Sequence, residues 1–111
     1  MERELKYYNT DKLVTYNNPS FINKMIELFI KSSKEYLANI SLALSKNDLV
    51  SINQLAHQIK PSLDLLNINS ITQSIRDIEN ASVINNDLID LINFTNNELD
   101  IVNQQMQNDY K

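Results

Sequence analysis

Apolar residues recur at spacings of three and four along most of the chain, which is the period of an amphipathic α-helix. The longest such stretch extends from Phe21 to Leu44, and the next extends from Leu49 to Leu66. No segment alternates with a period of two over more than a few residues, so no strand is expected. The pattern predicts five helices, at about residues 11–16, 19–45, 48–66, 70–81 and 87–107.

Asparagine-rich segments separate these helices. Asparagine caps helices and tolerates the left-handed backbone conformation better than other residues with a side chain. Asn18 is expected to cap the second helix, with Pro19 in its first turn, and Asn69 to cap the fourth. Because the connections are only about two to five residues long, consecutive helices should be antiparallel neighbours. The predicted architecture is all-α, an antiparallel up-down-up-down four-helix bundle with a short N-terminal helix packed across one end.

The composition excludes several classes of function. The 111 residues fit one domain, over residues 1–111, and they include no glycine, no cysteine and one histidine. Phosphate-binding loops, dinucleotide fingerprints and nucleophile elbows need glycine, whereas disulfides, zinc–thiolate sites and iron–sulfur clusters need cysteine. A single histidine also excludes any site with two imidazole ligands.

The charge pattern argues against two kinds of partner. The formal net charge is −4, and neither sign forms a long run, so nothing indicates a nucleic-acid interface. No apolar stretch approaches the roughly 18–20 residues of a membrane span, and the charged N-terminus lacks the apolar core of a signal peptide. We therefore expect a cytoplasmic monomer that binds neither nucleic acid nor membranes.

His57 is the one residue in the chain with an imidazole, and it falls within the predicted third helix. Helical geometry places it on a polar face with Asn53, Lys60, Pro61 and Asp64. Lys60 lies one turn along, where an ammonium is well placed to neutralise an anion carried by the ring. Pro61 removes the helical hydrogen bond to the His57 carbonyl, and nothing in the packing pattern requires a proline there. These positions alone fit either an ordinary surface histidine or a chemical site.

The segment around His57 resembles a known family. Residues 56–62, Ala-His-Gln-Ile-Lys-Pro-Ser, and then 65–68, Leu-Leu-Asn-Ile, resemble the signature of histidine-containing phosphotransfer (HPt) domains of two-component phosphorelays. That signature reads roughly Ala-His-x-Leu-Lys-Gly-Ser, followed by a Leu-Gly-Ala-like element. Residues 19–21 and 28–30 resemble the start of the family's long second helix, and residues 47–49 resemble its turn before the histidine helix. The chain departs from the family at Pro61 and Asn67, where glycine is usual.

The resemblance implies a function and a set of site residues. His57 would accept a phosphoryl group on Nε2 from an aspartyl phosphate of a receiver domain and pass it to another receiver aspartate. Lys60 would stabilise the phosphate, and Pro61 and Ser62 would line the site. The partners would be receiver domains of response regulators or hybrid histidine kinases. Mg²⁺ would belong to the receiver, so the chain would be a phosphocarrier with no cofactor and no kinase, phosphatase or hydrolase activity of its own.

A docking surface for the receiver should surround His57. In the family, the first helix and the start of the second supply its apolar part, although residues there can equally lie at the edge of the core. The candidate docking residues are Leu13, Tyr16, Met25, Asn53, Gln58 and Asp64.

Two functions from other classes do not fit this sequence. A serine–histidine triad needs a strained elbow and an oxyanion hole, which a helical chain without glycine does not supply. A carboxylate di-metal bundle needs two Glu-x-x-His pairs, and the chain has none. The remaining alternative is a non-catalytic adaptor, or a degenerate domain that binds receivers without carrying phosphate. An adaptor has no reason to keep His57 and Lys60 together on one exposed face.

Overall fold

The computed structural model describes residues 8–14 and 18–110, and the elements in this part of the chain are helical. The all-α class is thus confirmed. The elements are α1 Asp11–Val14, α2 Pro19–Ser45, α3 Leu49–Leu65, the 3₁₀ turn η1 Asn69–Ile71, α4 Thr72–Glu79 and α5 Asn86–Asp109. Within these ranges no helix is both long and apolar enough to cross a membrane.

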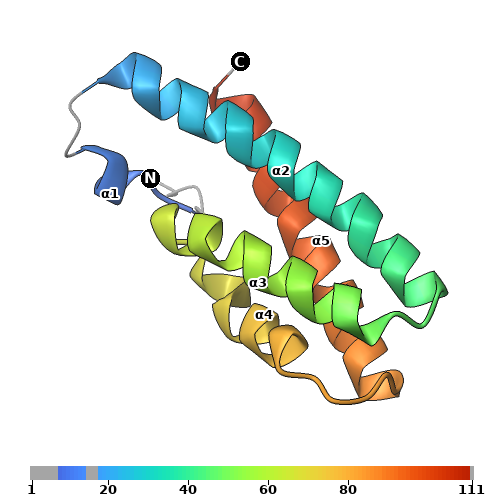
Figure 1. Cartoon of the computed structure of the whole chain (residues 1–111). Coiled ribbons are helices and arrows are strands. Elements are labelled where there is room, and N and C mark those ends of the chain that lie inside the picture. The colour runs from blue at the N-terminus through green and yellow to red at the C-terminus, as the bar shows by residue number, and fades with distance from the viewer. Residues whose placement is uncertain (1–7, 15–17, 111) are drawn as a thin grey trace, which may run out of the picture.

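The four longer helices pack around a common core. Helix α2 packs against α3 and α5, and α4 packs against the same two helices. Figure 1 shows that successive helices among α2, α3, α4 and α5 run in opposite directions, and that α1 lies at the end where α2 begins and α3 ends. Hydrogen bonds attach the N-terminal segment there: Lys12 Nζ donates to the Asp64 carbonyl at 2.6 Å, the Asn9 amide donates to the Leu66 carbonyl at 2.9 Å, and Asn67 Nδ2 donates to Asn9 Oδ1 at 2.6 Å.

Side-chain caps begin the three longest helices. The Asn18 side-chain oxygen accepts hydrogen bonds from the amides of Ser20 and Phe21, at 3.0 and 3.3 Å, so the predicted cap of α2 is confirmed. Asp48 and Asn85 begin α3 and α5 in the same way, each accepting from the third amide along the chain. Each cap satisfies amides that have no carbonyl partner within the first turn of a helix.

The expected cap of the fourth helix is wrong. Asn69 does not cap a helix; it is the first residue of η1, which leads directly into α4, and α4 begins without a side-chain cap. A 3₁₀ turn satisfies amides through hydrogen bonds three residues apart, so it can replace a capping side chain. The helical segment therefore starts with a tighter turn than its apolar spacing indicated.

Two asparagines end α2 and α3 where most proteins would use glycine. Asn47 and Asn67 both have φ of 53°, in the left-handed region that asparagine tolerates better than other residues with a side chain. The amide after each one returns to a carbonyl in the last turn: Asp48 to Ala43 and Ile68 to Leu63, both at 2.9 Å. These bonds form the Schellman motif, and they turn the chain sharply into the next helix.

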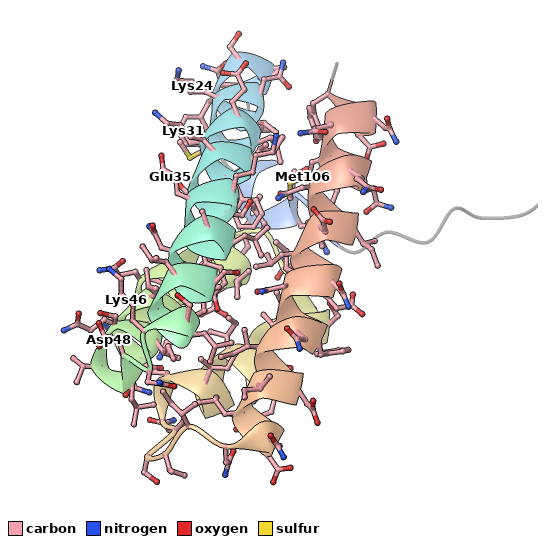
Figure 2. All side chains as sticks on the ribbon, turned by 90° about the vertical axis from the view of Figure 1, so that its right-hand side faces the viewer. Lys24, Lys31, Glu35, Lys46, Asp48 and Met106 are labelled. Atoms are coloured by element: carbon pink, nitrogen blue, oxygen red, sulfur yellow. The ribbon has the colours of Figure 1, made fainter. Side chains whose placement is uncertain are left out.

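The core between the helices is mostly aliphatic, with isoleucine the most frequent residue. Met106 of α5 is fully buried and points toward α2 in Figure 2, whereas Lys24, Lys31 and Glu35 project from the far side of α2. One polar pair interrupts the apolar contact between α2 and α5. The buried Ser33 hydroxyl of α2 donates to Asn103 Oδ1 of α5 at 2.9 Å.

Candidate functional site

His57 lies in the middle of α3 with its ring on the surface. Ala56 and Ile59 on either side of it are buried in the core, so the helix turns the imidazole outward. The side chain keeps 69% of its surface exposed. This position allows a protein partner to reach the ring without any rearrangement of the bundle.

Glu79, the last residue of α4, contacts both His57 and Lys60. One carboxylate oxygen is hydrogen-bonded to His57 Nδ1, and the other accepts from Lys60 Nζ at 2.7 Å. The Glu79 side chain is only 19% exposed and that of Lys60 is 30% exposed. The carboxylate therefore connects the imidazole and the ammonium across the α3–α4 interface.

The charge of Glu79 determines where the imidazole carries its proton. The hydrogen bond from Lys60, and after it the one from His57, lowers the pKa of the Glu79 carboxyl below its usual range, so the group is ionised near neutral pH. An ionised carboxylate can only accept hydrogen bonds, so the hydrogen between the two residues belongs to His57 Nδ1. In the neutral ring, Nε2 then has no proton and presents its lone pair as a nucleophile.

Asn53 lies one turn before His57 on the same face of α3 and also contacts α4. Its amide nitrogen donates to the carbonyls of Ile78 and Ala81, at 2.8 and 3.2 Å. The side chain is partly buried, with its amide engaged inside the protein. Asn53 is one of the predicted docking residues, and in the structure its amide makes a contact between helices.

The other docking candidates differ in exposure. Leu13 is 1% exposed, so it offers no side-chain surface to a partner; its burial follows from the packing of α1 against the end of the bundle. Met25 is half-buried and packs against the core, whereas Gln58 and Asp64 are exposed. Tyr16 lies outside the described residues.

The site-lining residues follow His57 by one turn of α3. Pro61 is exposed, and Ser62 is half-buried beside it. The helix continues through Pro61 to Leu65, although the proline has no N–H to donate to the His57 carbonyl. His57 and Pro61 are both exposed, so water can reach this turn and bind the carbonyl, which reduces the cost of the missing bond.

Sequence analysis missed Glu79, although the chain holds a signal for it. In an antiparallel helical hairpin, residues at equal distances from the connection lie level with each other. His57 is eleven residues before Ile68 in the connection, and Glu79 is eleven residues after it. That register, together with the predicted antiparallel α3 and α4, would have identified Glu79 as the acid nearest to His57.

The chemistry of the site follows from the groups that it brings together. Within the described residues, no group of three or more histidine, cysteine, aspartate or glutamate side chains is arranged to hold a metal ion. What the arrangement provides is an exposed imidazole, a half-buried carboxylate that orients the ring, and an ammonium beside it.

Comparison with known proteins agrees with this geometry. Among curated proteins and solved structures no match to the chain was found. The family model of the Hpt domain matches residues 24–109, which include all of α3, α4 and α5 and most of α2. Because this match covers most of the chain and contains His57, Lys60 and Glu79, the protein belongs to the Hpt domain family.

Proposed function

We propose that the protein is a phosphorelay intermediate in which His57 reversibly carries the phosphoryl group. Hpt domains are histidine phosphotransfer modules of phosphorelays, and His57 is the only histidine in this chain. The observation that carries the proposal is the hydrogen bond between His57 Nδ1 and Glu79, which leaves Nε2 exposed and without a proton. An ordinary surface histidine has no such fixed orientation.

The proposed reaction begins when the aspartyl phosphate of a receiver domain meets Nε2. The Nε2 lone pair attacks phosphorus, the bond from phosphorus to the aspartyl oxygen breaks, and that oxygen leaves with the electron pair as a carboxylate. The ring keeps its proton on Nδ1 and gains a positive charge, which faces the ionised Glu79. The ammonium of Lys60 offsets negative charge on the phosphoryl group. Transfer to a second receiver follows the same steps in reverse.

The partners follow from this reaction. We propose receiver domains of response regulators or hybrid histidine kinases as donor and acceptor, and a cytoplasmic, monomeric carrier. The chain itself contributes positioning and charge, which is most of what phosphoryl transfer requires of a protein. Mg²⁺ would remain on the receiver, so a chelator should stop transfer while phosphorylated protein already separated from the receiver keeps its phosphate.

The test is incubation with a receiver domain that carries radiolabelled aspartyl phosphate. We expect label on this chain that acid removes and base does not, which is the behaviour of phosphohistidine. His57→Gln should abolish labelling with unchanged helical circular dichroism, whereas Gln104→Ala, an exposed substitution on α5, should label normally. Label retained by His57→Gln would refute the assignment. Receiver binding without labelling of the parent protein would instead indicate the adaptor.

A further inference from the structure

Three polar residues of α3 contact the last turn of α4, and they lie along one face of α3. Asn53, His57 and Lys60 are spaced four and three residues apart, so they follow each other by one helical turn. His57 and Lys60 bind the Glu79 carboxylate, whereas Asn53 binds backbone carbonyls next to it. The proposed reaction uses His57 and Lys60 but gives Asn53 no role.

The two carbonyls that Asn53 binds stand on either side of Glu79. Ile78 precedes Glu79 by one residue, and Ala81 follows it by two. Carbonyls at the end of a helix are open to groups outside that helix. The Ile78 carbonyl also accepts from the Ala81 amide at 3.3 Å, and the Asn53 amide binds the carbonyls of both residues of this turn at once. The amide thereby holds the last turn of α4 and the segment just after it, on both sides of the carboxylate.

Apolar packing alone does not fix that end of α4 in the same way. The Ile78 side chain is fully buried and anchors the helix to the core, but contacts between apolar groups have no preferred direction. Hydrogen bonds do have one, and they weaken steeply when their angle changes. The two bonds from Asn53 therefore set how the end of α4, with its carboxylate, faces α3.

We infer that Asn53 is a positioning residue for phosphoryl transfer: by binding the carbonyls of Ile78 and Ala81 it holds Glu79 against His57 Nδ1. Asn53 contacts neither the imidazole nor the phosphoryl group. It acts through Glu79, and its effect is to keep the Nε2 nitrogen of the ring free of a proton. This inference rests on the proposed function for its consequence, but its structural part can be measured without any phosphate.

The measurement is nitrogen NMR of the imidazole in the unphosphorylated protein. Because the chain has one histidine, its two ring nitrogens give an unambiguous signal, and their shifts report the ratio of the Nδ1–H to the Nε2–H form. We expect the Nδ1–H form to dominate in the parent protein. In Glu79→Ala this form should no longer be favoured over the Nε2–H form. In Asn53→Ala the ratio should fall about fivefold, which corresponds to roughly 1 kcal/mol.

A stability-matched control separates positioning from general loosening of the bundle. Ile92→Val removes one methylene-sized group from the core in α5, a helix that supplies none of the hydrogen bonds of Asn53, His57 and Glu79, and its thermal melt can be compared with that of Asn53→Ala. The ratio in Ile92→Val should remain that of the parent. Where Asn53→Ala does not fold, Asn53→Ser replaces it, because its hydroxyl ends one atom short of the amide nitrogen.

The outcomes are distinct for the two claims. An unchanged imidazole ratio in the asparagine variant, or an equal change in Ile92→Val, overturns the role of Asn53. A shifted ratio with a proportionally slower transfer from the receiver supports it. If the ratio shifts but the parent protein accepts no phosphate, the proposed function fails while the structural link from Asn53 to His57 stands.

Discussion

At the scale of single residues, Glu79 has a different relation to each of its two partners. It holds His57 by Nδ1, which leaves Nε2 free for chemistry, but it also occupies the ammonium of Lys60. An incoming phosphoryl group must therefore share that ammonium with the carboxylate. Lys60 keeps Glu79 ionised, and in the proposed reaction it would also offset the charge of the phosphate.

We predict that Lys60→Ala slows transfer, or shortens the lifetime of phosphohistidine, by about two- to fivefold without unfolding the bundle. The change is small because a partly exposed ion pair is screened by solvent. Transfer rate and phosphate lifetime are measured beside circular dichroism. Lys24→Ala is the matched control, since Lys24 is an exposed lysine of α2 paired within its own helix. Equal transfer rates and equal phosphate lifetimes in the parent protein and Lys60→Ala would show that Lys60 only binds Glu79 and does not act on the phosphate.

Glu79→Gln should flatten part of the acid dependence of stability. Because the pKa of Glu79 is below its ordinary value of 4.5 in the folded protein, its ionised form stabilises the fold above pH 4.5. That contribution disappears as the pH falls from 4.5 through the lower folded pKa. Urea unfolding at several pH values measures this contribution as the difference in unfolding free energy between the parent protein and Glu79→Gln. The difference should shrink on acidification; Asp48, whose pKa is also lowered, is common to both proteins and cancels.

At the scale of elements, the helix that contains His57, α3, also contains a proline in its interior, Pro61. Proline inside a helix normally costs about 3 kcal/mol, through the lost hydrogen bond and the clash with the preceding turn. Here the residue is exposed and the helix continues beyond it to Leu65. The family's usual glycine at this position imposes no such constraint, so we expect the orientation of His57 not to depend on the proline.

We therefore predict that Pro61→Ala raises the free energy of unfolding, by up to about 3 kcal/mol, and leaves the transfer rate unchanged. Thermal melts and the receiver assay measure the two effects on one variant. Slower transfer with higher stability would mean that the proline helps to aim the ring. Lower stability would contradict both views, and would show that the proline ring makes packing contacts that stabilise the fold.

The same elements show which features a sequence can predict. Asn18 as a cap and Asn67 in the left-handed conformation depend on neighbours within a few residues, so local rules identify them. The role of Asn53 depends on carbonyls 25 and 28 residues away on another helix. Periodicity places it correctly on the face of His57 but does not show that α4 covers that face. Polar residues of an amphipathic helix look solvent-exposed until the neighbouring helix is placed.

At the scale of the whole molecule, the bundle separates two tasks. Helices α3 and α4 carry the site residues, whereas the contact between α2 and α5 contains the one buried hydrogen bond between side chains of different helices that the described residues show. That bond joins Ser33 and Asn103, which are 70 residues apart. Polar pairs in an aliphatic core add little net stability, but they can fix the register of the helices that carry them.

Removal of the Ser33–Asn103 pair should change the stability of the bundle. Ser33→Ala removes the donor of this bond and leaves the buried Asn103 Oδ1 without its hydrogen bond. The Asn103 amide nitrogen already lacks a partner among the described residues. We expect the single variant to lose about 1–3 kcal/mol of unfolding free energy. The double variant Ser33→Ala/Asn103→Leu should recover that loss, because leucine has the branching of asparagine without its polar atoms.

Urea denaturation measures these variants, and Thr95→Val is the matched control. Thr95 also has a buried hydroxyl, but its hydrogen bond goes to the Leu91 carbonyl within α5, so its loss leaves no side chain of another helix unpaired. A double variant less stable than Ser33→Ala would show that the pair contributes net stability. If the double variant is stable but its amide NMR spectrum shows more than one state, the pair specifies the packing of α2 on α5. In either case transfer to His57 should stay within about twofold of the parent rate as long as α3 and α4 remain folded, because the reacting groups belong to the other half of the bundle.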